Sequence, residues 1–94
     1  MSNEQNKIKV TIRTPEGVIF DEECASVSSR NILGNFDILP FHTNFITHIN
    51  DNLTIRTLDN NAKIIPVQIG VVRVKRNIMD VYIILSPILH PSDK

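Results

Sequence analysis

The 94-residue chain contains only three glycines, one cysteine and no tryptophan, and these scarcities limit what it can do. A phosphate-binding loop needs closely spaced glycines, whereas Gly17, Gly34 and Gly70 are far apart. With Cys24 as the only cysteine, the chain cannot form an internal disulfide, which favours a reducing compartment. The residue counts therefore argue against a nucleotide-binding enzyme and against a disulfide-stabilised secreted domain.

Neither sign of charge prevails, because 10 lysines and arginines balance 10 aspartates and glutamates. A chain without net charge has no long-range field to attract nucleic acid or an acidic membrane. No stretch approaches the roughly 18 apolar residues of a membrane span, and the first residues lack the apolar run of a signal peptide. We therefore expect neither nucleic-acid binding nor direct membrane insertion. Zero net charge also limits the solubility of a free monomer, which favours a protein partner.

The apolar residues make up 41% of the chain and alternate with polar ones at a period of two. Residues 8–12 show this pattern of a half-buried strand in its simplest form. Turn signals such as Pro15-Glu16-Gly17 and Asp59-Asn60-Asn61 recur every eight to twelve residues or so, as in sandwiches and barrels. A change of phase between Cys24 and Val27 predicts a β-bulge or a corner.

The pattern predicts an all-β fold in a single domain over residues 1–94. We expect an antiparallel β-sandwich of about eight to ten short strands. The ordered part is expected at about residues 7–85, a polar loop at residues 28–35 and a tail at residues 86–94. The predicted core consists of Ile8, Val10, Ile12, Phe20, Phe36, Ile38, Phe45, Ile55, Ile65, Val67, Val72, Val74, Val81 and Ile83.

Candidate metal-binding and nucleophilic residues are few. A zinc site needs three or four ligands, and the chain offers His42, His48, His90 and the thiol of Cys24. Backbone hydrogen bonding by His42 and a polar strand face for His48 are the simpler interpretations. A single cysteine in a strand is more often a small core residue than a nucleophile. We therefore expect no catalytic residue, no bound metal and no cofactor.

Two charged clusters also have structural explanations. The run from Asp21 to Glu23 is typical of a solvated strand end rather than of a general acid–base pair. The cations Arg73, Lys75 and Arg76 surround a predicted hairpin turn, where charge protects a strand edge. Binding of single-stranded nucleic acid would require stacking aromatic side chains nearby, and Tyr82 is the one candidate.

The last predicted strand is apolar on both faces. One face is expected to enter the core, yet the opposite face carries Ile78, Tyr82 and Ile84. A strand in a sandwich with one core should have a polar outer face. The outer apolar face therefore needs cover, either from Ile88 and Leu89 in the tail or from another protein.

Several stretches resemble the N-terminal β-sandwich of the epsilon subunit of F-type ATP synthases, over roughly residues 7 to 85. They agree with it in order and spacing. The matching stretches are Thr14-Pro15 with Phe20, then Gly34-x-Phe36-x-Ile38-Leu39-Pro40-x-His42, then Leu53-Thr54-Ile55-Arg56, and finally Ile69 to Val74.

The resemblance implies a non-catalytic subunit of the central stalk, whose partners are the gamma subunit and the membrane ring of c subunits. Such a subunit couples rotation to ATP synthesis, driven by protons or sodium ions. It would be cytoplasmic and attached peripherally to the energy-transducing membrane through the synthase. The family's C-terminal helical hairpin, a brake on ATP hydrolysis in many bacteria, has no counterpart in this sequence. We therefore expect a subunit that couples but does not brake.

The resemblance and the outer apolar face together predict which residues contact partners. The family's ring-contacting loop matches residues 30–35 and runs on to His42, and Asn35 stands where many members carry Glu. The residues expected at partners are Arg30, Asn31, Asn35 and His42 on the c-ring side, and Tyr82 and Ile84 on the gamma side.

Some positions depart from the family pattern. Phe41 and Ile69 replace glycines of the family, and glycines permit unusual φ angles or close backbone approach. These departures leave a second interpretation open, in which the chain is a divergent β-sandwich adaptor or small-ligand-binding module outside any ATP synthase.

Overall fold

The computed structural model describes residues 7–41 and 44–87, and in these ranges the chain forms strands and no helix. The all-β fold class, with about eight to ten strands, is confirmed. The eight strands are β1 (Ile8–Thr14), β2 (Gly17–Asn31), β3 (Gly34–Ile38), β4 (Phe45–Ile49), β5 (Leu53–Thr57), β6 (Ala62–Ile65), β7 (Val67–Lys75) and β8 (Ile78–Leu85).

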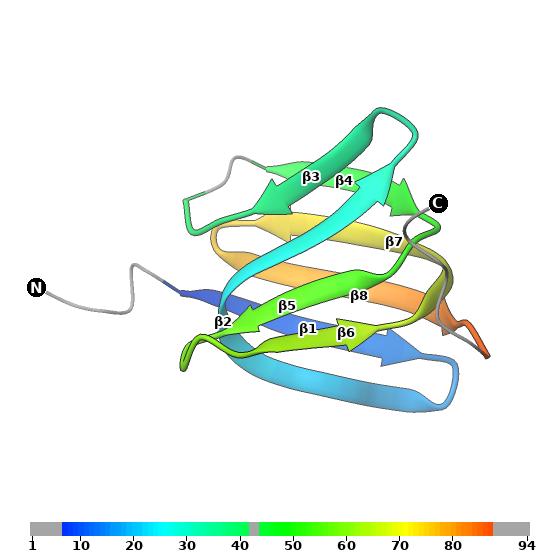
Figure 1. The fold of residues 1–94 in the computed structure, drawn as a ribbon, viewed down its shortest axis with the longest axis horizontal. Helices are drawn as coiled ribbons and strands as arrows, with labels where there is room; N and C mark the ends of the chain where they lie inside the picture. Colours follow the sequence, from blue (N-terminus) through cyan, green and yellow to red (C-terminus); the bar gives the residue numbers. More distant parts are fainter. Residues whose placement is uncertain (1–6, 42–43, 88–94) are drawn as a thin grey trace, which may run out of the picture.

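The strands form two layers that share β2 (Figure 1). The hydrogen-bonded order is β4-β7-β8-β1-β2-β5-β6, and β3 also pairs with β2. Residues 17–24 of β2 pair with β1, whereas residues 24–31 pair with β5 and β3. The register with β5 shifts between Cys24 and Ser26, which confirms the predicted bulge or corner. At 15 residues, β2 is longer than the short strands that we expected.

The expectation of a wholly antiparallel sandwich is wrong for one pair of strands. β1 and β8 run parallel, with Val10 opposite Met79 and Ile12 opposite Val81. Antiparallel neighbours can be joined by a tight turn, whereas parallel ones need a long connection. Here that connection is the whole chain between β1 and β8, so local turn signals carry no information about the pairing.

The predicted polar loop at residues 28–35 is instead a β-hairpin made of the end of β2 and all of β3. Ser28 pairs with Asp37, and Arg30 pairs with Asn35. The segment is polar because much of its surface faces solvent, and Ser28 Oγ donates a 2.6 Å hydrogen bond to Asp37 Oδ1 on the partner strand. The tight turn is possible because Gly34 has a φ of 124°.

Eleven of the fourteen predicted core residues are buried. The other three, Phe36, Phe45 and Ile65, are only partly buried against the core. They lie on β3, β4 and β6, which are edge strands, so no neighbouring strand covers their outer side. The phenyl rings of Phe36 on β3 and Phe45 on β4 pack edge to face, with their centroids 5.5 Å apart. The core also includes Cys24, Val27, Ile49, Leu53 and Met79, which the prediction omitted.

Gly70 is required by close packing at the middle of β7. A Cβ atom at this position would lie 2.5 Å from Cγ2 of Ile83 and 2.9 Å from the carbonyl oxygen of Tyr82. Both distances are shorter than van der Waals contact, and the second involves backbone that cannot rotate away. Glycine at this position therefore lets β7 lie close against β8.

Replacing Phe20 with Ala should lower the free energy of unfolding by about 3 kcal/mol or more, because the buried ring fills space that a methyl group leaves empty. Urea melts followed by far-ultraviolet circular dichroism would measure the change. Leu58→Ala, at an exposed position, is the control and should change the free energy by less than about 0.5 kcal/mol. If the free energy of unfolding of Phe20→Ala is within error of the wild-type value, Phe20 does not stabilise the core.

Candidate partner-binding surfaces

Apolar side chains exposed on the surface are the candidate contacts for a partner. Within residues 7–41 and 44–87, no group of three or more His, Cys, Asp or Glu side chains could hold a metal ion. In the same residues no helix has the length and apolar character needed to cross a membrane. Exposed large apolar side chains lie at many positions of the described surface, and in two places they lie beside the predicted partner-binding residues.

The first place is the tip of the β2–β3 hairpin. Ile32 is 98% exposed and Leu33 is 92% exposed. The tip is held in shape from its base, because the Leu33 N–H donates a 2.9 Å hydrogen bond to Asn31 Oδ1. Asn31 Nδ2 donates a 3.0 Å hydrogen bond to Thr47 Oγ1 on β4, which ties the hairpin to the neighbouring strand. Two aliphatic side chains are thus presented to solvent on an anchored turn, which is costly unless a partner covers them.

The structure brings three of the four predicted c-ring residues together. Arg30, Asn31 and Asn35 lie on the β2–β3 hairpin, next to its tip. The fourth, His42, lies outside the described residues. The adjacent Phe41 is at the other end of β3, where its N–H donates a 2.6 Å hydrogen bond to Asn77 Oδ1 in the β7–β8 turn (Figure 1). Phe41 therefore lies near the β7–β8 turn, at the end of β3 that is away from the hairpin tip.

Sequence reasoning missed Ile32 and Leu33, the most exposed aliphatic residues of this hairpin. They were assigned to a polar loop because their neighbours are polar. The available signal was Gly34 directly after the pair, because a glycine between two runs of strand-forming residues is typical of a tight hairpin turn.

The second place is a groove on the outer face of β7 and β8. It has a volume of about 410 Å³, and its walls include Tyr82 and Ile84, the predicted gamma-side residues, together with Ile69. Tyr82 is 51% exposed and Ile84 is 43% exposed. The predicted apolar outer face of the last strand is therefore open among the described residues. Ile88 and Leu89, the predicted alternative cover, lie outside them.

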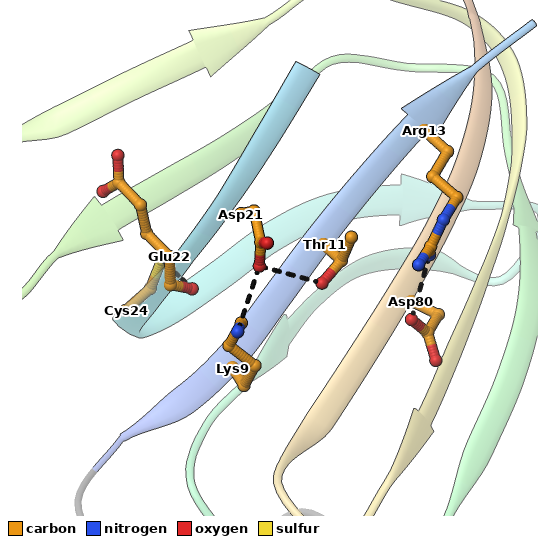
Figure 2. Close-up of polar contacts among 7 residues, drawn as sticks. All are labelled: Lys9, Thr11, Arg13, Asp21, Glu22, Cys24 and Asp80. Atoms are coloured by element: carbon orange, nitrogen blue, oxygen red, sulfur yellow. Dashed lines mark hydrogen bonds and ion pairs between the residues drawn. The ribbon is translucent and has the colours of Figure 1, made fainter. Parts of the chain in front are cut away.

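Polar contacts lie beside the groove, on β1, β2 and β8 (Figure 2). Lys9 Nζ lies 3.1 Å from Asp21 Oδ1, and the Lys9 ammonium holds the pKa of the Asp21 carboxyl below its ordinary value. Arg13 Nη1 lies 3.2 Å from Asp80 Oδ1, and the Arg13 guanidinium stacks 5.5 Å from the centre of the Tyr82 ring. Arg13 thus borders the groove while its charge is already paired.

Cys24 lies in the core, at the bend of β2, and not in either surface. Its thiol donates a weak hydrogen bond to the carbonyl oxygen of Glu22 at 3.6 Å. Burial disfavours the thiolate and raises the pKa of the Cys24 thiol from 9.0 to about 11. Since only the thiolate is strongly nucleophilic, this environment suits a packing residue.

Comparison with known proteins identifies the domain type. Residues 7–83 match the family model of the ATP synthase delta/epsilon chain β-sandwich domain. A curated relative, the ATP synthase epsilon chain of Carboxydothermus hydrogenoformans, is 32% identical over 72 residues, which are 77% of this chain and 54% of the relative. The chain thus spans about half the length of this curated relative.

Two solved structures share the fold. A chain of the Euglena gracilis mitochondrial ATP synthase, solved by cryo-electron microscopy as OSCP/F1/c-ring in rotational state 1, gives a TM-score of 0.76 at 17% identity, covering 83% of this chain and 51% of that one. A chain of the Tetrahymena thermophila mitochondrial ATP synthase central stalk and c-ring gives a TM-score of 0.69 at 17% identity, covering 85% of this chain and 65% of that one.

Raising the pH should destabilise the wild-type protein more than its Cys24→Ala variant. The folded-state pKa of about 11 exceeds the ordinary value of 9.0, so the stability that this group contributes is present below pH 9.0 and is lost as the pH rises through 11. Urea midpoints of both proteins at about pH 8 and about pH 10.5 would measure the difference. Parallel pH dependence in the two proteins would contradict the prediction, and in that case the thiol would titrate alike in the folded and unfolded chains.

Proposed function

The chain belongs to the ATP synthase delta/epsilon β-sandwich family, and from this we propose that it is a non-catalytic central-stalk subunit of an F-type ATP synthase. Its partners are the gamma subunit and the c-ring, and its task is to couple the rotation of both to ATP synthesis. It is attached to the energy-transducing membrane peripherally, through the complex. The match over residues 7–83 favours this function over an adaptor or ligand-binding module.

The observation that carries the proposal is the pair of exposed apolar surfaces on a sandwich whose core is otherwise well packed. The hairpin tip exposes Ile32 and Leu33, and the groove exposes Ile69, Tyr82 and Ile84. Burial of an aliphatic side chain on binding contributes about 1.5–3 kcal/mol. A free monomer gains nothing from these side chains, whereas a stalk subunit held between two partners does.

We assign the groove to the gamma subunit and the hairpin to the c-ring. Tyr82 and Ile84 provide the apolar contact on the gamma side. On the ring side, Arg30, Asn31 and Asn35 surround the aliphatic tip, and the resemblance alone adds His42. The two surfaces differ in form, since one is concave and the other is a protruding turn, and each can engage a different partner.

Changing Tyr82 and Ile84 together to Ser should weaken binding of the gamma subunit by about tenfold or more, because both side chains lose apolar area that the partner would bury. Copurification and titration with recombinant gamma subunit would measure the affinity. Leu58→Ser, on the β5–β6 turn and 51% exposed, is the control and should bind normally. Unaltered binding by the double variant would place the stalk contact elsewhere on the sandwich.

Changing Leu33 to Ser, or Asn35 to Arg, should reduce ATP-driven ion pumping by the reassembled synthase while the affinity for gamma stays within twofold of the wild type. The tip lies away from Tyr82 and Ile84, so the change should affect only the ring contact. Pumping in vesicles by a fluorescent pH or sodium indicator, compared with ATP hydrolysis by the same vesicles, would measure coupling. Full coupling by both variants would exclude the hairpin as the ring contact.

A further inference from the structure

The groove and the hairpin are joined by a second hollow, of about 480 Å³. This hollow lies between the hairpin, through Arg30 and Ile32, and the ends of β4 and β7. His48 and Ile69 line both the groove and the second hollow, so the two share a wall. Neither residue received a partner role from the sequence.

Strand pairing explains why these concavities are continuous. His48 on β4 is opposite Val71 on β7, and Val71 is opposite Tyr82 on β8, so the three residues form one row across three strands. Ile69 pairs with Ile84 in the adjacent part of the same sheet. The hydrogen bond from Asn31 to Thr47 holds the hairpin against β4, which places the hairpin flank at the end of that row.

The surface formed by the groove and the second hollow favours a negatively charged partner, although the chain as a whole has no net charge. No aspartate or glutamate is among the residues that line either hollow, whereas Arg13 borders one and Arg30 borders the other. Arg13 is engaged by Asp80. Within residues 7–41 and 44–87, the ion pairs within 4.0 Å involve Lys7, Lys9 and Arg13, and none includes Arg30. Arg30 is therefore available to a carboxylate of a partner.

We infer that the groove and the second hollow are one docking surface, continuous through His48 and Ile69, for an acidic amphipathic segment of the gamma subunit. Apolar side chains of that segment pack on Tyr82, Ile84 and Ile69, and a carboxylate pairs with Arg30. The inference rests on the proposed function for the identity of the partner. It extends that function and changes one assignment in it, because a partner that fills both hollows contacts Arg30 on the flank of the hairpin as well as the groove. Arg30 then contacts gamma, while Leu33 and Asn35 remain on the ring side.

The affinity for recombinant gamma subunit tests whether the wall shared by the two hollows contacts the partner. Ile69→Ser should weaken binding about tenfold or more. Ile64→Ser should stay within about twofold, because Ile64 lies on β6 in the other layer. The two positions are a matched pair, since Ile69 is 54% exposed and Ile64 is 52% exposed. Urea melts of both variants would verify that neither change alters folding.

A second pair of variants tests the charge. Arg30→Ala should weaken gamma binding severalfold and reduce the dependence of the dissociation constant on sodium chloride, since an exposed ion pair is screened by salt. Arg56→Ala removes an exposed arginine from β5, outside both hollows, and should leave the affinity and its salt dependence unchanged.

The outcomes separate the inference from the proposed function. If Tyr82→Ser/Ile84→Ser loses gamma while Arg30→Ala binds like the wild type, the groove acts alone and the inference is wrong, because Ile69 lines both hollows whereas Arg30 lines only the second. If removal of residues 88–94 raises gamma affinity about tenfold, the surface belongs to the tail. If the free chain is a dimer that Ile69→Ser dissociates, the surface belongs to a second copy. Either result also overturns the inference. A wild-type chain that binds no gamma subunit contradicts the proposed function and the inference together.

Discussion

The fold depends on the continuity of β2 through its bend at Cys24. A single strand of 15 residues pairs with β1 in one layer and with β5 and β3 in the other. Each layer alone would expose its apolar face to water, and the shared strand holds the two faces together. Cys24 occupies the inside of the bend because a small, unbranched side chain fits where the two layers converge, and its burial keeps the thiol protonated.

The same strand explains why the hairpin protrudes. The last residues of β2 pair with β3, which is off the main path of the sheet, and the turn beyond them leaves Ile32 and Leu33 almost fully exposed. Most exposed turns carry polar residues, yet Ile32 and Leu33 stand here on a turn fixed by Asn31 and Gly34. An anchored turn loses little conformational entropy on binding, so an aliphatic tip of this kind is well suited to a persistent contact.

The groove depends on close packing below it. Gly70 allows β7 to lie against Ile83 and the Tyr82 backbone, and Gly70 and Ile83 line the groove together with Ile69 and Ile84. Arg13 borders the groove with its charge paired to Asp80 and its guanidinium against the Tyr82 ring. The groove is thus apolar at its centre and bordered by a paired cation. This character agrees with a subunit that transmits force by contact.

The sequence by itself determined the all-β class, most of the core and the apolar outer face of β8, because alternation at a period of two depends only on neighbouring residues. It also indicated the corner after Cys24, but it favoured a polar loop at residues 28–35, where the structure has a hairpin. It could not reveal the parallel pairing of β1 with β8, because residues 10 and 79 come together only after the rest of the chain has folded between them. The sequence could not reveal the partial exposure of Phe36, Phe45 and Ile65 either, because the order of strands in the sheet decides which strands lie at its edges. Only the tertiary structure joined His48 and Ile69 into one wall between the groove and the hairpin, because side chains that are distant in sequence share a surface only through strand register.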